Sequence, residues 1–240
     1  MEFLFLFVLV FISWLNPTIL KNIHEKEDTF FKLATQGQML FALLMGVFIA
    51  DAFNGGSIGF AVGYIGVRLI HLVLQERMYR TRADLPRGRR NAFKGYVISV
   101  LLWTVSLFVP PPFRFVLWGM GLALDILAPF AKSRRPEADN RIIMLDRHHL
   151  PERLGLFAIL VMGESVIVLA LVNNLSNGTP FTWVTGVVGA VGFIMMAALW
   201  WLYFQYMENY VVGTKSWSLP LFLCSHVSLY AGIIMLLACL

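Results

Sequence analysis

Residues 146–172 have the sequence DRHHLPERLGLFAILVMGESVIVLALV. A charged leader with two histidines runs into an apolar run, 154–172, which is long enough to cross a hydrocarbon core of about 30 Å as a helix. Glu164 lies in the middle of this run, about 15 Å along the helix from its start. A carboxylate at that depth is costly unless it is neutral, paired or wet, so Glu164 is a candidate functional residue.

The composition extends this interpretation to the whole chain. Hydrophobic residues make up 58% of the 240 residues and charged residues only 14%, and the mean hydropathy is +0.72. A soluble domain of this length does not have such an excess of apolar surface, which needs lipid as its solvent. We therefore expect an all-α, polytopic bundle of transmembrane helices.

Continuous apolar runs separated by polar turns predict about eight spans within a single transmembrane domain, 1–240. Asn16 and Pro17 are expected to close the first run, and Asn54-Gly55-Gly56 to form a tight turn after the second. The predicted spans are 1–15, 34–53, 57–75, 92–109, 113–131, 154–172, 181–204 and 219–240.

The basic residues predict the orientation. Of the 19 lysines and arginines, all but Arg68 and Arg114 lie in or beside the first, third, fifth and seventh loops. Basic loops face the cytoplasm, so we expect a multi-pass protein of the cell (inner) membrane, with these loops in contact with anionic lipid. The net charge of +5 then reflects the basic cytoplasmic loops, and we expect no nucleic acid partner. Trp200, Trp201 and Tyr203 are expected to form an interfacial aromatic belt.

Helical phase divides the third span into two faces. One face carries small residues at a GxxxG spacing, which suits close packing against another helix. The opposite face is polar and is expected to point into the bundle. The small face consists of Gly59, Gly63, Gly66 and Ile70, and the polar face of Tyr64, Arg68, His71 and Gln75.

Depth in the membrane predicts which charged side chains meet. Arg68 and Asp125 lie about 10 Å and 9 Å from the cytoplasmic ends of their spans, so we expect them to form a buried pair. His226 lies at a similar depth, and Glu164 is about 5 Å deeper. The predicted intramembrane polar layer consists of Arg68, His71, Asp125, Glu164 and His226. Two interpretations stay open: a path for ions, protons or substrate, or internal contacts that only fix the helix register.

A second polar motif, His148, His149, Glu152 and Arg153, lies at the cytoplasmic mouth of the sixth span. Adjacent histidines point in different directions on a helix, so no shared metal is expected. Pro151 and Glu152 suit the first turn of a helix. Nothing in the chain resembles a phosphate loop, a zinc motif or a nucleophile elbow, and we predict no catalytic residue, metal or cofactor.

Five segments together resemble the bacterial low temperature requirement A (LtrA) family. The family's histidine, Glu-Arg, Gly-Leu-Phe, Gly-Glu, Arg, Asp and later His positions have counterparts here: His149, Glu152, Arg153, Gly155, Leu156, Phe157, Gly163, Glu164, Arg68, Asp125 and His226. The segments are FAVGYIGVRLIH at 60–71, GLALDILAPF at 121–130, HHLPERLGLFAILVMGES at 148–165, WWLYF at 200–204 and LCSHVSLYAG at 223–232.

The resemblance implies a polytopic bacterial membrane protein that takes part in cold or stress adaptation. Family members usually open with a further helix that carries an ELFFDLVFV-like segment, and they usually continue beyond the last span found here. We therefore expect a partial member of the family. The resemblance implies no settled reaction.

Three functions fit these residues. A transporter or channel would use the intramembrane polar layer and would need a wet crevice that reaches Glu164. A structural or sensory membrane protein would have no flux, and its basic loops would contact anionic lipid or a partner. A membrane-embedded enzyme would act on lipid-linked substrates with His148, His149 and Glu152 at the interface. The residues favour the first two over an enzyme and give no oligomeric state.

Overall fold

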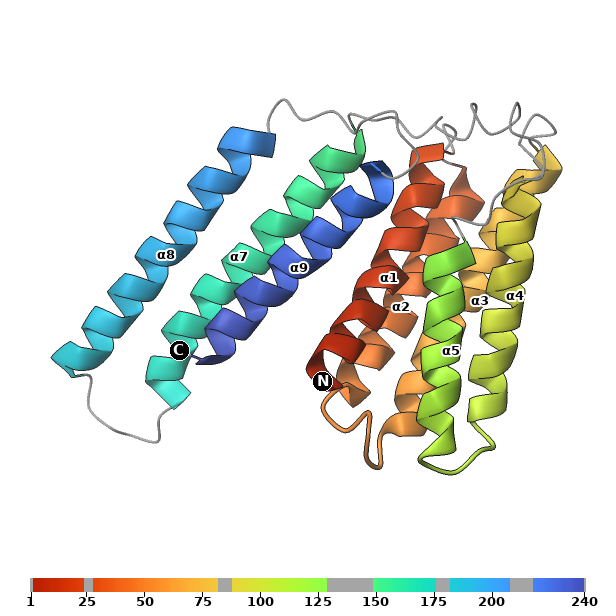
Figure 1. Ribbon diagram of the computed structural model, residues 1–240, viewed down its shortest axis with the longest axis horizontal. Coiled ribbons are helices and arrows are strands. Elements are labelled where there is room, and N and C mark those ends of the chain that lie inside the picture. The colour runs from red at the N-terminus through yellow and green to blue at the C-terminus, as the bar shows by residue number, and fades with distance from the viewer. Residues whose placement is uncertain are drawn as a thin grey trace. The chain divides into compact units, whose positions relative to one another are not determined.

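The computed structural model describes residues 2–23, 28–81, 88–128, 149–175, 182–207 and 218–239. All the regular elements in these residues are α-helices (Figure 1), which confirms the predicted fold class. They fall into two compact units, Met1–Leu145 and Asp146–Leu240, and each unit is described by itself. The predicted organisation as a single transmembrane domain stays a prediction.

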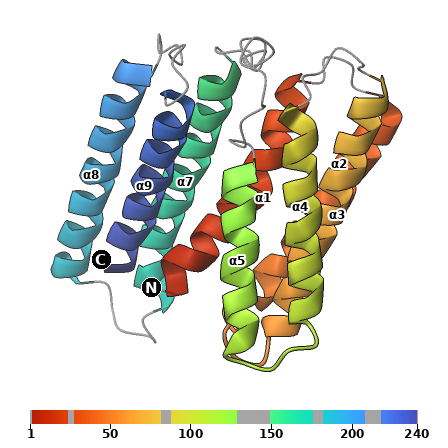
Figure 2. The same cartoon turned by 45° about the vertical axis from the view of Figure 1, so that its right-hand side comes forward.

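Unit 1 consists of α1 (Glu2–Ile23), α2 (Thr29–Phe48), α3 (Ser57–Thr81), α4 (Gly88–Ser106) and α5 (Phe113–Leu127). Within it, α3 contacts α1, α2 and α4, and α5 contacts α1 and α4. Figure 2 shows α4 and α5 side by side. The two ends of this unit are called the Ser57 end and the Thr81 end below, after the first and last residues of α3.

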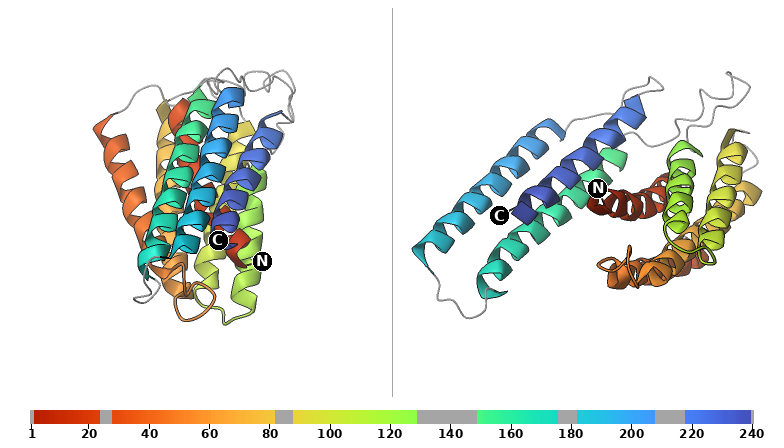
Figure 3. Two further views of the ribbon diagram at one scale, coloured as in Figure 1. Left: turned by 90° about the vertical axis from the view of Figure 1, so that its left-hand side faces the viewer. Right: turned by 60° about the horizontal axis from the view of Figure 1, so that its bottom comes forward.

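Unit 2 consists of α7 (His149–Leu175), α8 (Trp183–Met207) and α9 (Ser218–Cys239). Its helix α7 packs against both α8 and α9, and Figure 3 shows these three helices from two further sides.

In the part of the chain that the structure describes, five helices are long and apolar enough to cross a membrane. Length and composition support this conclusion, since about 20 apolar residues are needed to span the hydrocarbon core. The helix at Ala92–Ser106 is apolar but shorter. The five spans are Glu2–Lys21, Thr29–Phe48, Ser57–Thr81, Gly186–Met207 and Ser218–Leu236.

The first helix differs from the prediction. The run was expected to close at Asn16 and Pro17, whereas α1 continues to Ile23 with Pro17 inside it. Proline removes one backbone hydrogen bond, but ending a helix within lipid would leave several backbone groups unpaired, which costs more. Because the helix continues, Asn16 stays on its buried side.

Close packing between α2 and α3 confirms the predicted small face of α3. A Cβ atom at Gly63 would lie 2.8 Å from Met45 Cγ and 2.9 Å from the Met45 backbone nitrogen. Gly59 and Gly66 are crowded in the same way by Phe48 and Phe41 of α2. With α2 against its small face, α3 turns its polar face toward the other helices of unit 1.

The turn between α2 and α3 also agrees with the prediction. The Asp51 carbonyl accepts hydrogen bonds from the backbone N–H groups of Asn54 at 2.9 Å and Gly56 at 3.0 Å. At its other end, α2 is capped by Asp28, whose carboxylate accepts a hydrogen bond from the Phe31 N–H at 2.8 Å. The short turn makes α2 and α3 antiparallel neighbours, and the cap satisfies a backbone N–H group at the start of α2.

Gly63→Leu is expected to destabilise the protein by about 1–3 kcal/mol or more, because the added side chain has to displace Met45 and the α2 backbone. Thermal unfolding of the purified protein in detergent, followed by tryptophan fluorescence, measures the effect. Gly46→Leu is the matched control, since a Cβ atom at Gly46 meets nothing within 4 Å. Equal losses of stability in the two variants would contradict close α2–α3 packing.

Candidate functional site

A buried ion pair lies at the centre of unit 1. Arg68 of α3 and Asp125 of α5 meet with Arg68 Nη2 2.6 Å from Asp125 Oδ2. Arg68 is 2% exposed and Asp125 is 1% exposed. The pair predicted from depth along the two helices is therefore confirmed.

Tyr64 links the two charges. Its hydroxyl donates a hydrogen bond to Asp125 Oδ2 at 2.6 Å and accepts from Arg68 Nη2 at 3.0 Å and from Nε at 3.2 Å. Tyr64 and Arg68 are four residues apart and share one face of α3. Asp125 Oδ2 thus receives a charged and a neutral donor, both from the same helix.

Helix α1 completes the surroundings of the guanidinium. The Asn16 amide, with its oxygen turned toward Arg68, accepts hydrogen bonds from Nη1 and Nη2. The Arg68 Cζ atom also lies 5.1 Å from the centre of the Tyr64 ring and 5.7 Å from that of Tyr96 in α4, within the range of cation–π attraction. We call Asn16, Tyr64, Arg68 and Asp125 the Arg68 hub.

Four buried polar atoms of unit 1 have no hydrogen-bond partner among the described residues. They are Asp125 Oδ1, His71 Nδ1, Gln75 Oε1 and Trp103 Nε1. His71 and Gln75 continue the polar face of α3 beyond Arg68. Burying such an atom without a partner costs about 1–3 kcal/mol, so these positions are where a further hydrogen-bonding group is expected to bind.

The Ser57 end of unit 1 is polar too, but there the buried side chains are paired. Arg114 donates from Nε to the carbonyls of Ser106 and Val109, both at 3.1 Å, and from Nη1 to Ser57 Oγ. Trp118 Nε1 donates to Ser106 Oγ at 3.0 Å. Arg114, at the start of the predicted span 113–131, is buried in the first turn of α5.

In unit 2, Glu164 lies on the exposed side of α7 and has no polar partner among the described residues. Its neighbour Ser165 is buried and bonds to the Val161 carbonyl of its own helix at 2.7 Å. An exposed carboxylate in an apolar helix has to be neutral or to find water or a partner when the helix lies in a membrane.

His226 of α9 is buried in unit 2. Its Nδ1 lies 2.8 Å from the Phe222 carbonyl and its Nε2 lies 3.2 Å from the Tyr203 hydroxyl of α8. A neutral ring satisfies both contacts, with Nδ1–H donating and Nε2 accepting. One turn further along α9, the Tyr230 hydroxyl donates to the Leu154 carbonyl of α7 at 2.7 Å. These side chains hold the three helices together.

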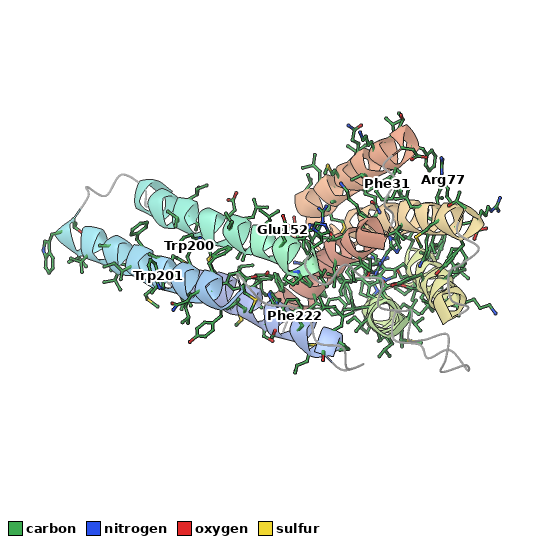
Figure 4. All side chains as sticks on the ribbon, turned by 90° about the horizontal axis from the view of Figure 1, so that it is seen from above. Phe31, Arg77, Glu152, Trp200, Trp201 and Phe222 are labelled. Carbon is green, nitrogen blue, oxygen red and sulfur yellow. The ribbon has the colours of Figure 1, made fainter. Side chains whose placement is uncertain are left out.

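The predicted aromatic belt on α8 is correct only in part. Trp200 and Trp201, labelled in Figure 4, are exposed. Tyr203 is buried against His226 instead, where its hydroxyl lies 3.2 Å from His226 Nε2.

The structure brings part of the predicted polar layer together. Arg68, His71 and Asp125 lie in unit 1, whereas Glu164 and His226 lie in unit 2. Within unit 1, His71 follows Arg68 by about one turn of α3. That all five residues form one layer stays a prediction.

The motif before the sixth predicted span forms the start of α7. His149 Nδ1 lies 3.1 Å from Glu152 Oε2 in the first turn, and both side chains are exposed. Arg153 is half-buried, and His148 lies outside the described residues. In the described ranges, no group of three or more His, Cys, Asp or Glu side chains could hold a metal ion.

Two members of the hub were not recognised as site residues from the sequence. Asn16 was interpreted as the end of the first span, although a lone asparagine in an apolar run is also a signal for a helix–helix contact. Tyr64 was placed on the polar face but given no role. Its position four residues before Arg68 could have identified it as a partner.

Replacing Arg68 or Asp125 alone by Ala is expected to destabilise the protein by about 3–5 kcal/mol, because the other charge is left buried and unpaired. The Arg68→Ala/Asp125→Ala double variant is expected to lose much less than the sum of the two. Denaturant unfolding in mixed micelles gives the free energies of unfolding for this double-mutant cycle. The exposed pair Arg80–Glu76, at 2.8 Å, is the control and is expected to show a coupling of about 0.3–0.5 kcal/mol. Additive effects of the Arg68 and Asp125 substitutions would show that the two charges do not interact.

A relative is known from Rhizobium meliloti (strain 1021), where it is described as Uncharacterized protein RA0937. The two sequences are 26% identical over 211 residues, which cover 84% of this chain and 49% of that protein. This chain therefore spans about half the length of that relative. No solved structure matches the chain.

The family described as Bacterial low temperature requirement A protein (LtrA) matches residues 1–240. The match covers every helix of both units, including those that carry Arg68, Asp125, Glu164 and His226. Together with the long apolar helices, it supports a multi-pass integral membrane protein. The chain belongs to the bacterial low temperature requirement A (LtrA) family.

Proposed function

We propose that this chain acts as a transporter or channel for protons or small ions, with the Arg68 hub as the part of the path in unit 1. The observation that carries the proposal is the state of Asp125. Its Oδ2 is engaged by Arg68 and Tyr64, while its buried Oδ1 has no partner among the described residues. A carboxylate with one free oxygen inside a membrane bundle is typical of proton and cation paths.

In the hub, protonation of Asp125 Oδ1 would weaken the ion pair that keeps Arg68 in place. A proton that binds Asp125 Oδ1 forms an O–H bond and neutralises the carboxylate. Arg68 then loses its counter-ion and keeps only the neutral contacts with Tyr64 and Asn16. Because an unpaired charge in the membrane interior is costly, protonation favours a change in the position of Arg68 or the entry of an anion.

Glu164 supplies a second candidate carrier in unit 2. It lies within an apolar helix and is exposed, with no polar partner among the described residues. A Glu164 sealed in the protein with both oxygens bonded would count against a path, and the described residues give it no such bonds. A role for Glu164 and His226 in the same path as Arg68 is part of the proposal.

One observation favours a second candidate, a structural or sensory membrane protein without flux. The Arg68 guanidinium has partners on α1, α3 and α5, which is the arrangement expected of a contact that fixes helix positions.

In either case we propose a place in the inner membrane with the basic loops in the cytoplasm against anionic lipid. A part in cold or stress adaptation, as the family's name suggests, also belongs to this proposal.

Proton flux into proteoliposomes tests the two candidates. The full chain is reconstituted with a pH-sensitive dye inside, and an imposed potassium diffusion potential drives the flux. We expect the unchanged chain to give a proton flux well above that of empty liposomes. Asp125→Asn should lose most of this flux and Glu164→Gln should reduce it. The difference in flux between the variants should change with pH.

Asp51→Asn is the matched control, since Asp51 is an exposed carboxylate in the turn between α2 and α3, and its flux should equal that of the unchanged chain. Each variant is first checked for folding by its thermal unfolding. Absence of proton flux and of alkali-cation flux in the folded, unchanged chain would reject the transport proposal in favour of the structural one.

A further inference from the structure

We propose that water, and the protons or small ions it carries, reaches the Arg68–Asp125 pair from the Thr81 end of unit 1 only. The way in follows the face of α3 that carries His71 and Gln75, and a cluster of aromatic rings closes the Ser57 end. The use of this access by a transported proton rests on the proposed function, but the access itself is measured independently of any flux.

Two of the four unpaired buried atoms lie between the Arg68–Asp125 pair and the Thr81 end. His71 and Gln75 follow Arg68 by three and seven residues on α3, which places them about 4.5 Å and 10 Å nearer the Thr81 end. His71 Nδ1 and Gln75 Oε1 both lack a partner among the described residues. They are one turn apart on the same face, so a single water or hydronium ion can contact both.

The other two unpaired atoms lie at the level of the pair itself. Trp103 packs against Gly121 of α5, where a Cβ atom would lie 2.5 Å from Trp103 Nε1. Gly121 is one turn before Asp125 on that helix. Trp103 Nε1 is a donor and Asp125 Oδ1 an acceptor, so they suit the two sides of one bridging water. The line of unpaired atoms therefore runs from Trp103 to Gln75.

From Trp103 toward the Ser57 end, the buried polar groups have partners. Trp118 Nε1, Ser106 Oγ and the Arg114 guanidinium bond to one another or to nearby carbonyls and Ser57. These groups satisfy one another within the protein and need no water. Buried polar atoms without a protein partner, by contrast, are usually held by ordered water.

Aromatic rings fill the space around these paired groups. The Trp103 and Trp118 rings stack with their centres 4.9 Å apart, and Tyr64 lies 4.2 Å from Trp103. Phe60, Phe53 and Phe115 surround Trp118 at 5.6 Å, 6.3 Å and 5.3 Å. We call Phe53, Phe60, Phe115 and Trp118, which lie between Trp103 and the Ser57 end, the aromatic seal. Its rings have few groups that hold water, so it separates the hub from the Ser57 end.

Thiol labelling of the full chain in membrane vesicles tests the proposal. In a Cys224→Ser/Cys239→Ser background, Gln75→Cys and His71→Cys place a thiol on the proposed way in, and Phe60→Cys places one in the seal. Arg80→Cys reports the Thr81 end and Asn54→Cys the Ser57 end, since both positions are exposed. The probe is a charged methanethiosulfonate reagent that does not cross lipid, added to one side of the vesicles at a time.

We expect Gln75→Cys and His71→Cys to react from the side that labels Arg80→Cys, with Gln75→Cys the faster because it lies nearer the end. Neither should react from the side that labels Asn54→Cys, and Phe60→Cys should react from neither side. Variants are compared only where thermal unfolding shows a folded protein, and Gln75→Cys suffices if His71→Cys does not fold.

Labelling of neither position, while both end reporters react, overturns the proposal. So does labelling from the Asn54 side, or labelling of Phe60→Cys from that side. One-sided labelling without any flux would keep this access and reject only the transport function. Flux without labelling would reject the access and leave the transport function in place.

Discussion

Unit 1 depends on one electrostatic constraint, which is that the Arg68 charge has to be neutralised where there is no bulk water. A guanidinium remains charged at any physiological pH. It therefore cannot lower the free-energy cost of its burial in the membrane interior by losing a proton. The pair with Asp125 at 2.6 Å meets that requirement and in doing so fixes the depth of α5 relative to α3. The Asn16 contact does the same for α1.

The two faces of α3 make different kinds of contact. The glycine face lets α2 approach closely, as the crowding of Gly63 by Met45 shows. The polar face then points toward α1, α4 and α5, the helices that supply Asn16, Tyr96 and Asp125. Because α2 packs on the glycine face, the opposite face of α3 is left to the charged contacts.

Much of this arrangement follows from patterns of spacing along single helices. Arg68 and Asp125 were paired correctly because depth in a membrane can be counted along a helix, and the glycine face was found from helical phase. Asn16 was missed because proline after asparagine is typical of a helix end in water, whereas lipid favours continuing the helix. The burial of Arg114 could not be predicted for a different reason, since its partners, Ser57 and two carbonyls, are distant in sequence or part of the backbone.

The order of the hub residues along the chain has a consequence for how the protein is made. Asn16 and Tyr64 precede Arg68, and Asp125 follows it by two helices. During synthesis, Arg68 therefore enters the bilayer before its counter-ion does. Asn16 and Tyr64 are the polar groups already present, and they can hold the guanidinium by neutral hydrogen bonds until α5 arrives. The asparagine inside the first apolar helix then serves membrane insertion as much as it serves the finished bundle.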